Sequence, residues 1–248
     1  MNPELVVEYL VGWVREQVKQ AGALGVVLGV SGGVDSAVAA VIAKKAFPDN
    51  CMALMLPCQS AICDRIDSQN LVEKFDIRYR IIDLDNAYQL ISTQLESYLK
   101  CDGLRGKLLR GNIKSRLRMM SLYYSAQARN YLVLGTSNKS EISVGYATKY
   151  GDSGVDIQVL GDLLKWEVYE LARYLGIPAE ILNKAPSGGL WPGQTDEAEL
   201  GFTYEQLDTY LSTEEGDPLV VESIKNKMRA SEHKRRKPPI AVIPENLR

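Results

Sequence analysis

The sequence has few cysteines and no long apolar run, and these absences narrow the classes of protein to which it can belong. Its 4 cysteines form no CxxC pair with the spacing of metal ligands, so we expect reduced thiols rather than a zinc site. No apolar run reaches the ~18 residues of a membrane helix, and no charged segment leads into a short apolar one as in a signal peptide. The sequence therefore predicts neither a membrane span nor an export signal, and we expect a cytoplasmic protein.

The balance of charge and hydrophobicity is that of an ordinary soluble enzyme. The formal net charge is only −2, which gives no general attraction to nucleic acid. Hydrophobic residues make up 46% and charged residues 24% of the 248 positions, which fits one large α/β domain with a sizeable core. We therefore expect residues 1–248 to form a single domain.

Strand-like and helix-like segments alternate along the chain. An amphipathic helix is predicted over residues 4–20, and an apolar strand begins at Leu24. Further strands are predicted over 51–57, 77–84 and 131–135, with helices over 37–46, 68–75 and 163–175. This alternation predicts a doubly wound parallel sheet with flanking helices, whose ligands gather at the carboxyl ends of the strands.

Residues 85–130 are too long for a simple crossover between two strands. Two helices are predicted there, over 85–100 and 112–129, separated by the glycine-containing stretch CDGLRGKLLRG. Their apolar residues exceed what one face of a sheet needs to cover. The excess leaves two alternatives, a helical homodimer interface and burial within the monomer.

The second half of the chain contains two irregular segments. Residues 136–160 are polar without a strong period, and a stretch of that length inside a compact domain is usually functional. Residues 184–200, rich in glycine and proline, are predicted to be a surface lid. Asp162 is the predicted N-cap of the helix over 163–175, a T-x-x-Q box at Thr203 begins another helix, and Asp217 with the following proline begins the last.

The turn from Ser31 to Ser36, SGGVDS, joins an apolar strand to a helix rich in small residues. Paired glycines turn the backbone N–H groups inward, and the helix start adds about +0.5 of partial charge, so the turn suits a polyphosphate. Asp35 stands where a Walker A loop would place a cation, and an acid beside phosphates implies a metal ion. The turn resembles the pyrophosphate loop of N-type ATP pyrophosphatases. The alternative is an ordinary glycine turn.

Three further residues are candidates for the same crevice. Glu141 follows the strand over 131–135 and would face Asp35, so that the two carboxylates hold Mg²⁺; the alternative is a solvated loop residue. Lys165 lies in a first helical turn, where a cation is disfavoured unless something anionic compensates, so it is either a phosphate clamp or an exposed lysine. Ser187 in the lid either donates a hydrogen bond to the same phosphate or is a solvated serine.

Basic residues form two clusters, Lys114 to Arg118 and His233 to Lys237. Neither cluster is interleaved with stacking aromatic residues, so we expect recognition of one anionic small molecule and no polynucleotide track.

Seven motifs together carry a specific resemblance. The segments SGGVDS, GNIKSRLRM, LGTSNKSE, ATKYGDSGVDI, GDLLKWEV, KAPSGGLW and DEAELGFTYEQLD occur in the order and spacing of ammonia-dependent NAD synthetases. The sequence resembles that family over most of residues 25–237. The resemblance implies a homodimeric ligase with an adenine nucleotide alpha hydrolase-like fold. Such an enzyme uses ATP and Mg²⁺ to adenylate the carboxylate of deamido-NAD, and ammonia then displaces AMP to give NAD.

The resemblance also implies roles for individual residues. Asp35 and Glu141 correspond to the magnesium ligands, and Lys165, Asp35 and Ser187 to the catalytic set. The implied ATP contacts are Gly29, Val30, Ser31, Gly32, Gly33, Val34, Asp35, Ser36, Thr136, Lys165 and Ser187. The implied deamido-NAD contacts are Arg116, Lys149, Asp156, His233 and Lys234.

Some features depart from the family pattern or remain open. Ser187 replaces a threonine common at that position, and the segment LPCQSAICDR matches weakly, leaving Met55 and Gln59 as candidates for adenosine contact. Asp156 is a candidate acceptor for the proton of ammonia. No Cys–His–Glu arrangement for glutamine hydrolysis is recognisable, so we expect free ammonia as the nitrogen donor. A tRNA-thiolating enzyme and a noncatalytic nucleotide-binding module are the alternatives.

Overall fold

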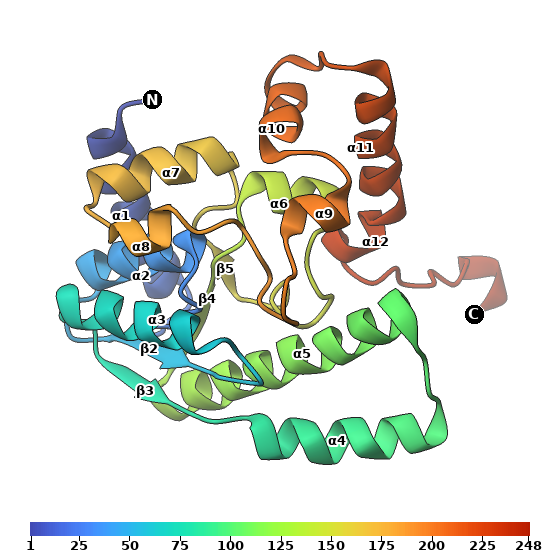
Figure 1. Cartoon of the computed structure of the whole chain (residues 1–248), viewed down its shortest axis with the longest axis horizontal. Helices are drawn as coiled ribbons and strands as arrows, with labels where there is room; N and C mark the ends of the chain where they lie inside the picture. Colours follow the sequence, from blue (N-terminus) through green and yellow to red (C-terminus); the bar gives the residue numbers. More distant parts are fainter.

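The computed structural model describes residues 1–248 and contains a parallel sheet with helices on both faces (Figure 1). The five strands are β1 (Gly25–Gly29), β2 (Cys51–Met55), β3 (Tyr79–Ile81), β4 (Tyr131–Gly135) and β5 (Ile157–Gln158). Their order is β3-β2-β1-β4-β5, so the chain moves outward from β1 and then crosses to its other side at β4. Ligands of such sheets bind where the direction reverses, beyond the carboxyl ends of β1 and β4. The predicted doubly wound fold is confirmed.

Alternation along β1 divides the core between the two faces of the sheet. Val26 and Leu28 pack in one cluster with apolar residues of α1 (Pro3–Gln20), α2 (Val34–Ala46) and α7 (Lys165–Tyr174). Val27 points to the opposite face, into a cluster with residues of α5 (Gly103–Arg129). Successive side chains of a strand alternate between faces, so both faces of β1 are covered and its end is held rigidly.

Two helices begin more than one turn before the residues at which the sequence predicted them. The helix α3 spans Ile62–Lys74 rather than beginning at Ser68, and α5 begins at Gly103 rather than at residue 112. The glycines interpreted as breaks lie inside α5 for steric reasons. A Cβ on Gly106 would overlap the carbonyl oxygen of Cys101, and one on Gly111 would lie 3.0 Å from the Leu190 side chain. The first helix of the excursion, α4 (Asp85–Tyr98), packs against α5.

The segment 136–160 is more ordered than its polarity predicted, since it contains α6 (Lys139–Val144) and β5. The helix α8 (Ala179–Leu182) follows α7, and α9 (Asp196–Leu200) ends the predicted lid. The prediction that Asp162 is the N-cap of α7 is wrong. The helix begins at Lys165, and the Asp162 carboxylate instead pairs with Lys139 Nζ at 3.0 Å.

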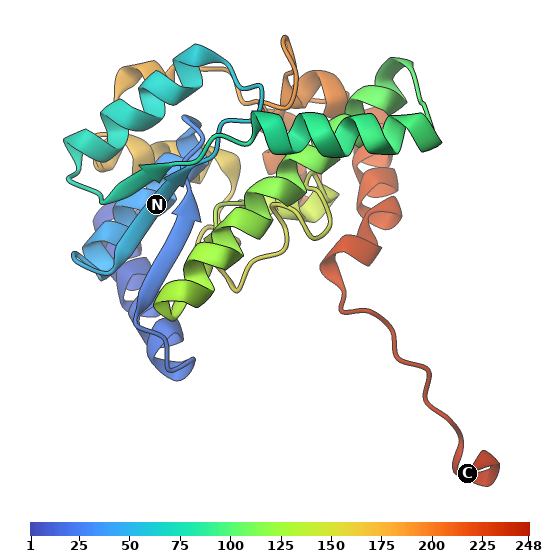
Figure 2. The same ribbon diagram turned by 90° about the horizontal axis from the view of Figure 1, so that it is seen from below.

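The C-terminal part is a helical pair beside α6. The pair is α10 (Tyr204–Thr213) and α11 (Pro218–Ala230), and the short α12 (Glu232–Arg235) follows it. The predicted box is present, because the Gln206 amide donates to Thr203 Oγ1 at 3.1 Å, and Asp217 caps α11 by accepting from the Leu219 amide at 2.9 Å. Beyond α12 the chain runs away from the body of the molecule to a 3₁₀ turn at Glu245–Leu247 (Figure 2). None of the helices combines the length and the apolar character needed to cross a bilayer.

Candidate active site

The Ser-Gly-Gly turn lies between the end of β1 and the start of α2, as the sequence predicted. Ser36 Oγ accepts from the Ser31 amide at 3.1 Å and donates to the Gly33 carbonyl at 2.9 Å, which closes the turn. Gly32 has a φ of +80°, and a Cβ there would lie 2.6 Å from the Asp64 carbonyl oxygen. The turn therefore requires glycine for both conformation and space.

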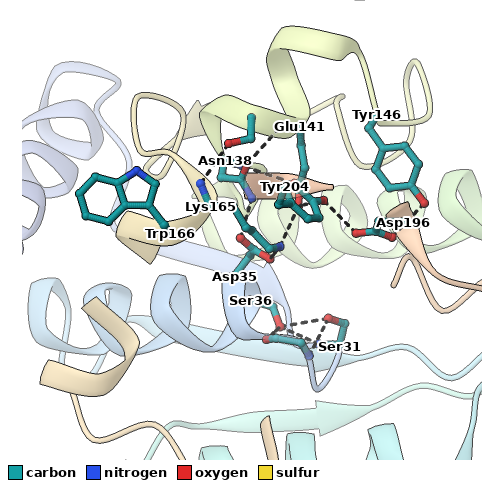
Figure 3. Close-up of polar contacts among 12 residues, drawn as sticks. Ser31, Asp35, Ser36, Asn138, Glu141, Tyr146, Lys165, Trp166, Asp196 and Tyr204 are labelled. Atoms are coloured by element: carbon teal, nitrogen blue, oxygen red, sulfur yellow. Dashed lines mark hydrogen bonds and ion pairs between the residues drawn. The ribbon is translucent and has the colours of Figure 1, made fainter. Parts of the chain in front are cut away.

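Three elements bring an ionic cluster to the helical end of this turn (Figure 3). Lys165 Nζ, at the start of α7, lies 2.6 Å from Asp35 Oδ2 on α2 and 3.2 Å from Glu141 Oε1 on α6. Asn138 Nδ2 donates to the other Asp35 oxygen at 2.8 Å. Residues separated by more than one hundred positions thus share one site, and the expectation that Asp35 and Glu141 face one crevice is supported by the shared lysine.

The cluster is shielded from water. The side chains of Lys165, Asp35 and Glu141 are 4%, 17% and 14% exposed. Burial raises the pKa of Glu141 above its ordinary value, and the nearby Asp35 charge adds to that effect. Burial alone would lower the pKa of Lys165, but Asp35 and Glu141 outweigh it and raise that pKa, which keeps the lysine charged. Neither the exposed-lysine nor the solvated-glutamate alternative is therefore correct.

The donor set fits a hard divalent cation that also binds phosphate. Within the chain, no group of three or more His, Cys, Asp or Glu side chains is placed to hold a metal by itself. The carboxylates of Asp35 and Glu141 converge and could supply two ligands of the cation. Its other coordination positions would be filled by phosphate oxygens and water, which is how Mg²⁺ is usually held beside nucleotides.

A second polar network, which the sequence analysis did not single out, lies against the cluster. Tyr204 Oη donates to Asp196 Oδ2 at 2.9 Å, and the Tyr204 ring lies 4.8 Å from Lys165 Nζ. Tyr146 Oη donates to Asp196 Oδ1 at 2.9 Å. Burial raises the pKa of Asp196, although Lys165 partly opposes this. The end of the predicted lid is therefore attached to the ionic cluster through a buried acid and a tyrosine.

The root of the predicted lid is attached as well, again through a residue that the sequence analysis missed. Lys184 Nζ lies 2.8 Å from Asp64 and 2.6 Å from Asp67, both on α3, and donates to the Gly32 carbonyl at 3.2 Å. Lys184 stands before a loop rich in glycine and proline, and nothing in that local sequence indicates a contact with α3 or the phosphate turn. Only the fold brings Lys184 to the phosphate turn.

Two predicted ATP contacts lie outside the ionic cluster. Thr136 is half-buried, directly after β4 at the carboxyl edge of the sheet. Ser187 is exposed on the loop, where its Oγ accepts from the Gly189 amide at 3.1 Å and makes no hydrogen bond with Asp35 or Lys165. Of the two adenosine candidates, Met55 is buried at the end of β2 and Gln59 is exposed in the following loop.

Four of the five predicted deamido-NAD residues form one connected group. Arg116 Nη2 donates to the Lys149 carbonyl at 3.2 Å, and Lys149 Nζ donates to the His233 carbonyl at 2.7 Å. Lys234 Nζ donates to the carbonyls of Gly145 and Ala147, each at 2.7 Å. The group joins α5, the loop after α6 and α12.

Asp156 does not hydrogen-bond to that group. It lies next to β5, where Oδ1 accepts from Tyr123 Oη at 3.0 Å and Oδ2 accepts from the Val133 amide at 2.7 Å. Burial and the neighbouring Asp156 raise the pKa of Tyr123 to about 12, so its hydroxyl stays protonated and donates to the carboxylate.

The parallel sheet, the glycine turn at the start of α2 and the buried acid–lysine cluster are the features of a nucleotide-dependent α/β enzyme. The NAD synthase family matches this chain over residues 6–238. A curated NH(3)-dependent NAD(+) synthetase from Syntrophomonas wolfei is 73% identical over 248 residues, covering 100% of both chains. The chain therefore belongs to the NAD synthase family, a family of ligases whose reaction is the ATP-dependent amidation of deamido-NAD.

Solved structures agree with this assignment at the level of the fold. An NMN synthetase from Francisella tularensis superposes with a TM-score of 0.90 at 38% identity, covering 99% of each chain. An NH3-dependent NAD synthetase from Campylobacter jejuni, in complex with nitrate, superposes with a TM-score of 0.81 at 31% identity. That alignment covers 98% of this chain and 100% of the other.

Proposed function

We propose that this chain joins ammonia to deamido-NAD with ATP and Mg²⁺ to give NAD, AMP and pyrophosphate, and that the residues described above form its site. The observation that carries the proposal is the convergence of Asp35, Glu141 and Lys165 at the end of the phosphate turn. A noncatalytic nucleotide-binding module would not need a buried lysine between two acids.

The chemistry explains why such a site is required. A carboxylate is a poor electrophile because its leaving group would be oxide. In the first step, a carboxylate oxygen of deamido-NAD attacks the α-phosphorus of ATP, the bond to the bridging oxygen breaks, and pyrophosphate leaves. In the second step, ammonia attacks the activated carbonyl carbon, AMP leaves with the bonding electrons, and one proton of the nitrogen is released.

Each part of the site has a task in the first step. The turn from Ser31 to Ser36 binds the phosphates at the helix start. Asp35 and Glu141 would hold Mg²⁺, which when bound neutralises phosphate charge. The ammonium of Lys165 stabilises the charge that develops on the phosphoryl oxygens as the bond breaks.

The second group of residues binds the dinucleotide. Arg116, Lys149, His233 and Lys234 lie together, and the arginine and the two lysines carry the positive charge that an anionic substrate needs. Asp156 is proposed to orient the substrate rather than to accept the ammonia proton, because both of its oxygens are already hydrogen-bonded. Residues 184–200, with Ser187, would cover the site and exclude water that competes with ammonia.

We also propose that the active form is a homodimer joined through α4 and α5. These helices expose large apolar side chains that nothing in the monomer covers, which favours an interface over burial. The exposed residues are Leu90, Ile91, Leu95, Tyr98, Leu104, Leu108, Leu109, Met120 and Tyr124.

The test is direct. Purified protein is incubated with ATP, MgCl₂, ammonium and deamido-NAD, and we expect NAD and AMP in equal amounts. Glutamine in place of ammonium should support little turnover. The absence of NAD, or equal turnover with glutamine, contradicts the proposal.

One observation favours testing a second candidate. The NMN synthetase structure superposes with the higher TM-score of the two described, 0.90. A parallel assay with the deamido form of NMN therefore compares the two substrates. We expect deamido-NAD to have the higher kcat/KM, because the curated NAD synthetase is 73% identical to this chain, whereas the NMN synthetase is 38% identical.

A further inference from the structure

The helix that carries Lys165 begins without an N-cap side chain that can accept a hydrogen bond. The N-cap residue of α7 is Leu164, whose side chain has no hydrogen-bonding group, and Asp162 is engaged elsewhere. The first amide groups of a helix lack partners within the helix and need them from outside. The Leu164 amide has a local partner, Glu167 Oε2 at 2.8 Å, but the acceptors of the next two amides come from distant parts of the chain.

Two side chains satisfy these amides in relay. The Lys165 amide donates to Ser140 Oγ at 3.0 Å, and the Trp166 amide donates to Asp208 Oδ2 at 3.1 Å. The Ser140 hydroxyl in turn donates to Asp208 Oδ1. One carboxylate thus holds the start of α7 both directly and through the serine.

Asp208 is unusually placed for an acid. It lies on α10, is 4% exposed, and forms no ion pair, whereas a buried carboxylate is normally paired with a cation. The partial positive charge at the start of α7 and two hydrogen bonds compensate its charge instead. The buried Asp208 carboxylate would lower the stability of the fold if it lost these two hydrogen bonds.

The partners of Asp208 are the chain neighbours of the catalytic cluster. Ser140 precedes Glu141 on α6, and Trp166 follows Lys165 on α7. Asp208 therefore bridges α6 and α7, the two helices that carry Glu141 and Lys165, whose Oε1 and Nζ lie 3.2 Å apart.

We propose that Asp208 is a positioning residue for the amidation reaction, which places Lys165 for phosphoryl stabilisation by capping α7 from α10. The inference rests on the proposed role of Lys165. Asp208 itself touches neither substrate nor metal.

The experiment is a double-variant cycle. Asp208→Ala, Lys165→Ala and the combined variant are compared by kcat and by KM for ATP and deamido-NAD. If Asp208 acts through Lys165, Asp208→Ala alone lowers kcat by about 10- to 100-fold while KM for deamido-NAD changes less than about 3-fold. In the Lys165→Ala background the same change lowers kcat by less than about 3-fold.

Asp217→Ala is the matched control, because Asp217 caps α11 in the same helical pair without contacting the cluster. It should leave kcat within about 2-fold of the wild type. If Asp208→Ala does not fold, Ser140→Ala provides the same cycle, since it removes both hydrogen bonds of the serine relay and leaves the direct bond from the Trp166 amide to Asp208. Asp208→Asn, which keeps the shape, should recover part of the activity.

The outcomes separate the two claims. If Lys165→Ala has nearly full activity, the proposed role of Lys165 is wrong, and the inference is wrong with it. If Lys165→Ala is impaired but the Asp208 and Lys165 losses multiply, or if folded Asp208→Ala has full activity, only the positioning role is overturned.

Discussion

Lys165 Nζ lies 2.6 Å from Asp35 Oδ2 and, with Glu141 on its other side, occupies the space between the two carboxylates. A divalent cation held by the same oxygens would have to share or displace that ammonium. If Asp35 and Glu141 hold Mg²⁺ as proposed, lysine and metal would compete for the two acids until ATP supplied phosphate oxygens to the lysine.

This competition gives a prediction for Lys165→Met. Without metal, the variant should be less stable than the wild type by about 3 kcal/mol, because two buried acids lose their counter-ion. Added MgCl₂, without ATP, should raise its melting temperature more than that of the wild type, since the acids are now free. Thermal unfolding with and without MgCl₂ measures both effects, and kcat should fall about 10²- to 10³-fold.

Lys139→Met is the control, because it removes a lysine whose partner, Asp162, is exposed. Its magnesium response should match that of the wild type. A Lys165→Met protein that magnesium does not stabilise would show that Asp35 and Glu141 are not a metal site.

The second prediction concerns the conformation of the phosphate turn. Gly32→Ala should destabilise the protein by more than the ~1 to 2 kcal/mol of a left-handed alanine, because its Cβ also meets the Asp64 carbonyl at 2.6 Å. Gly22→Ala isolates the first cost, since Gly22 has a φ of +65° and open space around it. Chemical denaturation compares the two. Equal losses would mean that α3 moves aside freely.

Local patterns account for the parts of the fold that the sequence predicted. The strand, glycine turn and helix from Gly25 to Ala46 follow from a short continuous apolar run and paired glycines. The helix α6 had its own signal, because Asn138 and Glu141 form a capping box in which the Glu141 amide donates to Asn138 Oδ1 at 3.0 Å. Interpreting Glu141 only as a ligand hid that second role.

Contacts between distant segments account for what the sequence could not predict. The cap of α7 comes from Asp208 rather than from the adjacent Asp162, and Lys184 reaches the phosphate turn from the start of the lid. Nothing in the flanking residues indicates either contact. Both depend on the packing of whole helices, which a period of 3.6 residues does not specify.

The third prediction tests the proposed dimer. Leu95→Lys with Tyr124→Lys places charge on exposed apolar positions of α4 and α5, 51% and 79% exposed in the monomer. Sedimentation at micromolar concentration should show a dimer for the wild type and a monomer for the variant. Leu219→Lys, on α11 and 83% exposed, should remain dimeric. A monomeric wild type refutes the interface.

The last prediction separates the two halves of the site. Lys149 Nζ donates to the His233 carbonyl at 2.7 Å, while the Lys149 carbonyl accepts from Arg116, so this lysine links the elements proposed to bind the dinucleotide. Lys149→Met should raise KM for deamido-NAD about 10-fold or more, the effect of losing one charged hydrogen bond. KM for ATP should be unchanged, because the Asp35 cluster is intact. Steady-state kinetics with each substrate varied measures both constants, with Lys139→Met as the control. An equal rise in both KM values would mean that Lys149 supports the whole fold, and that the substrate lies elsewhere.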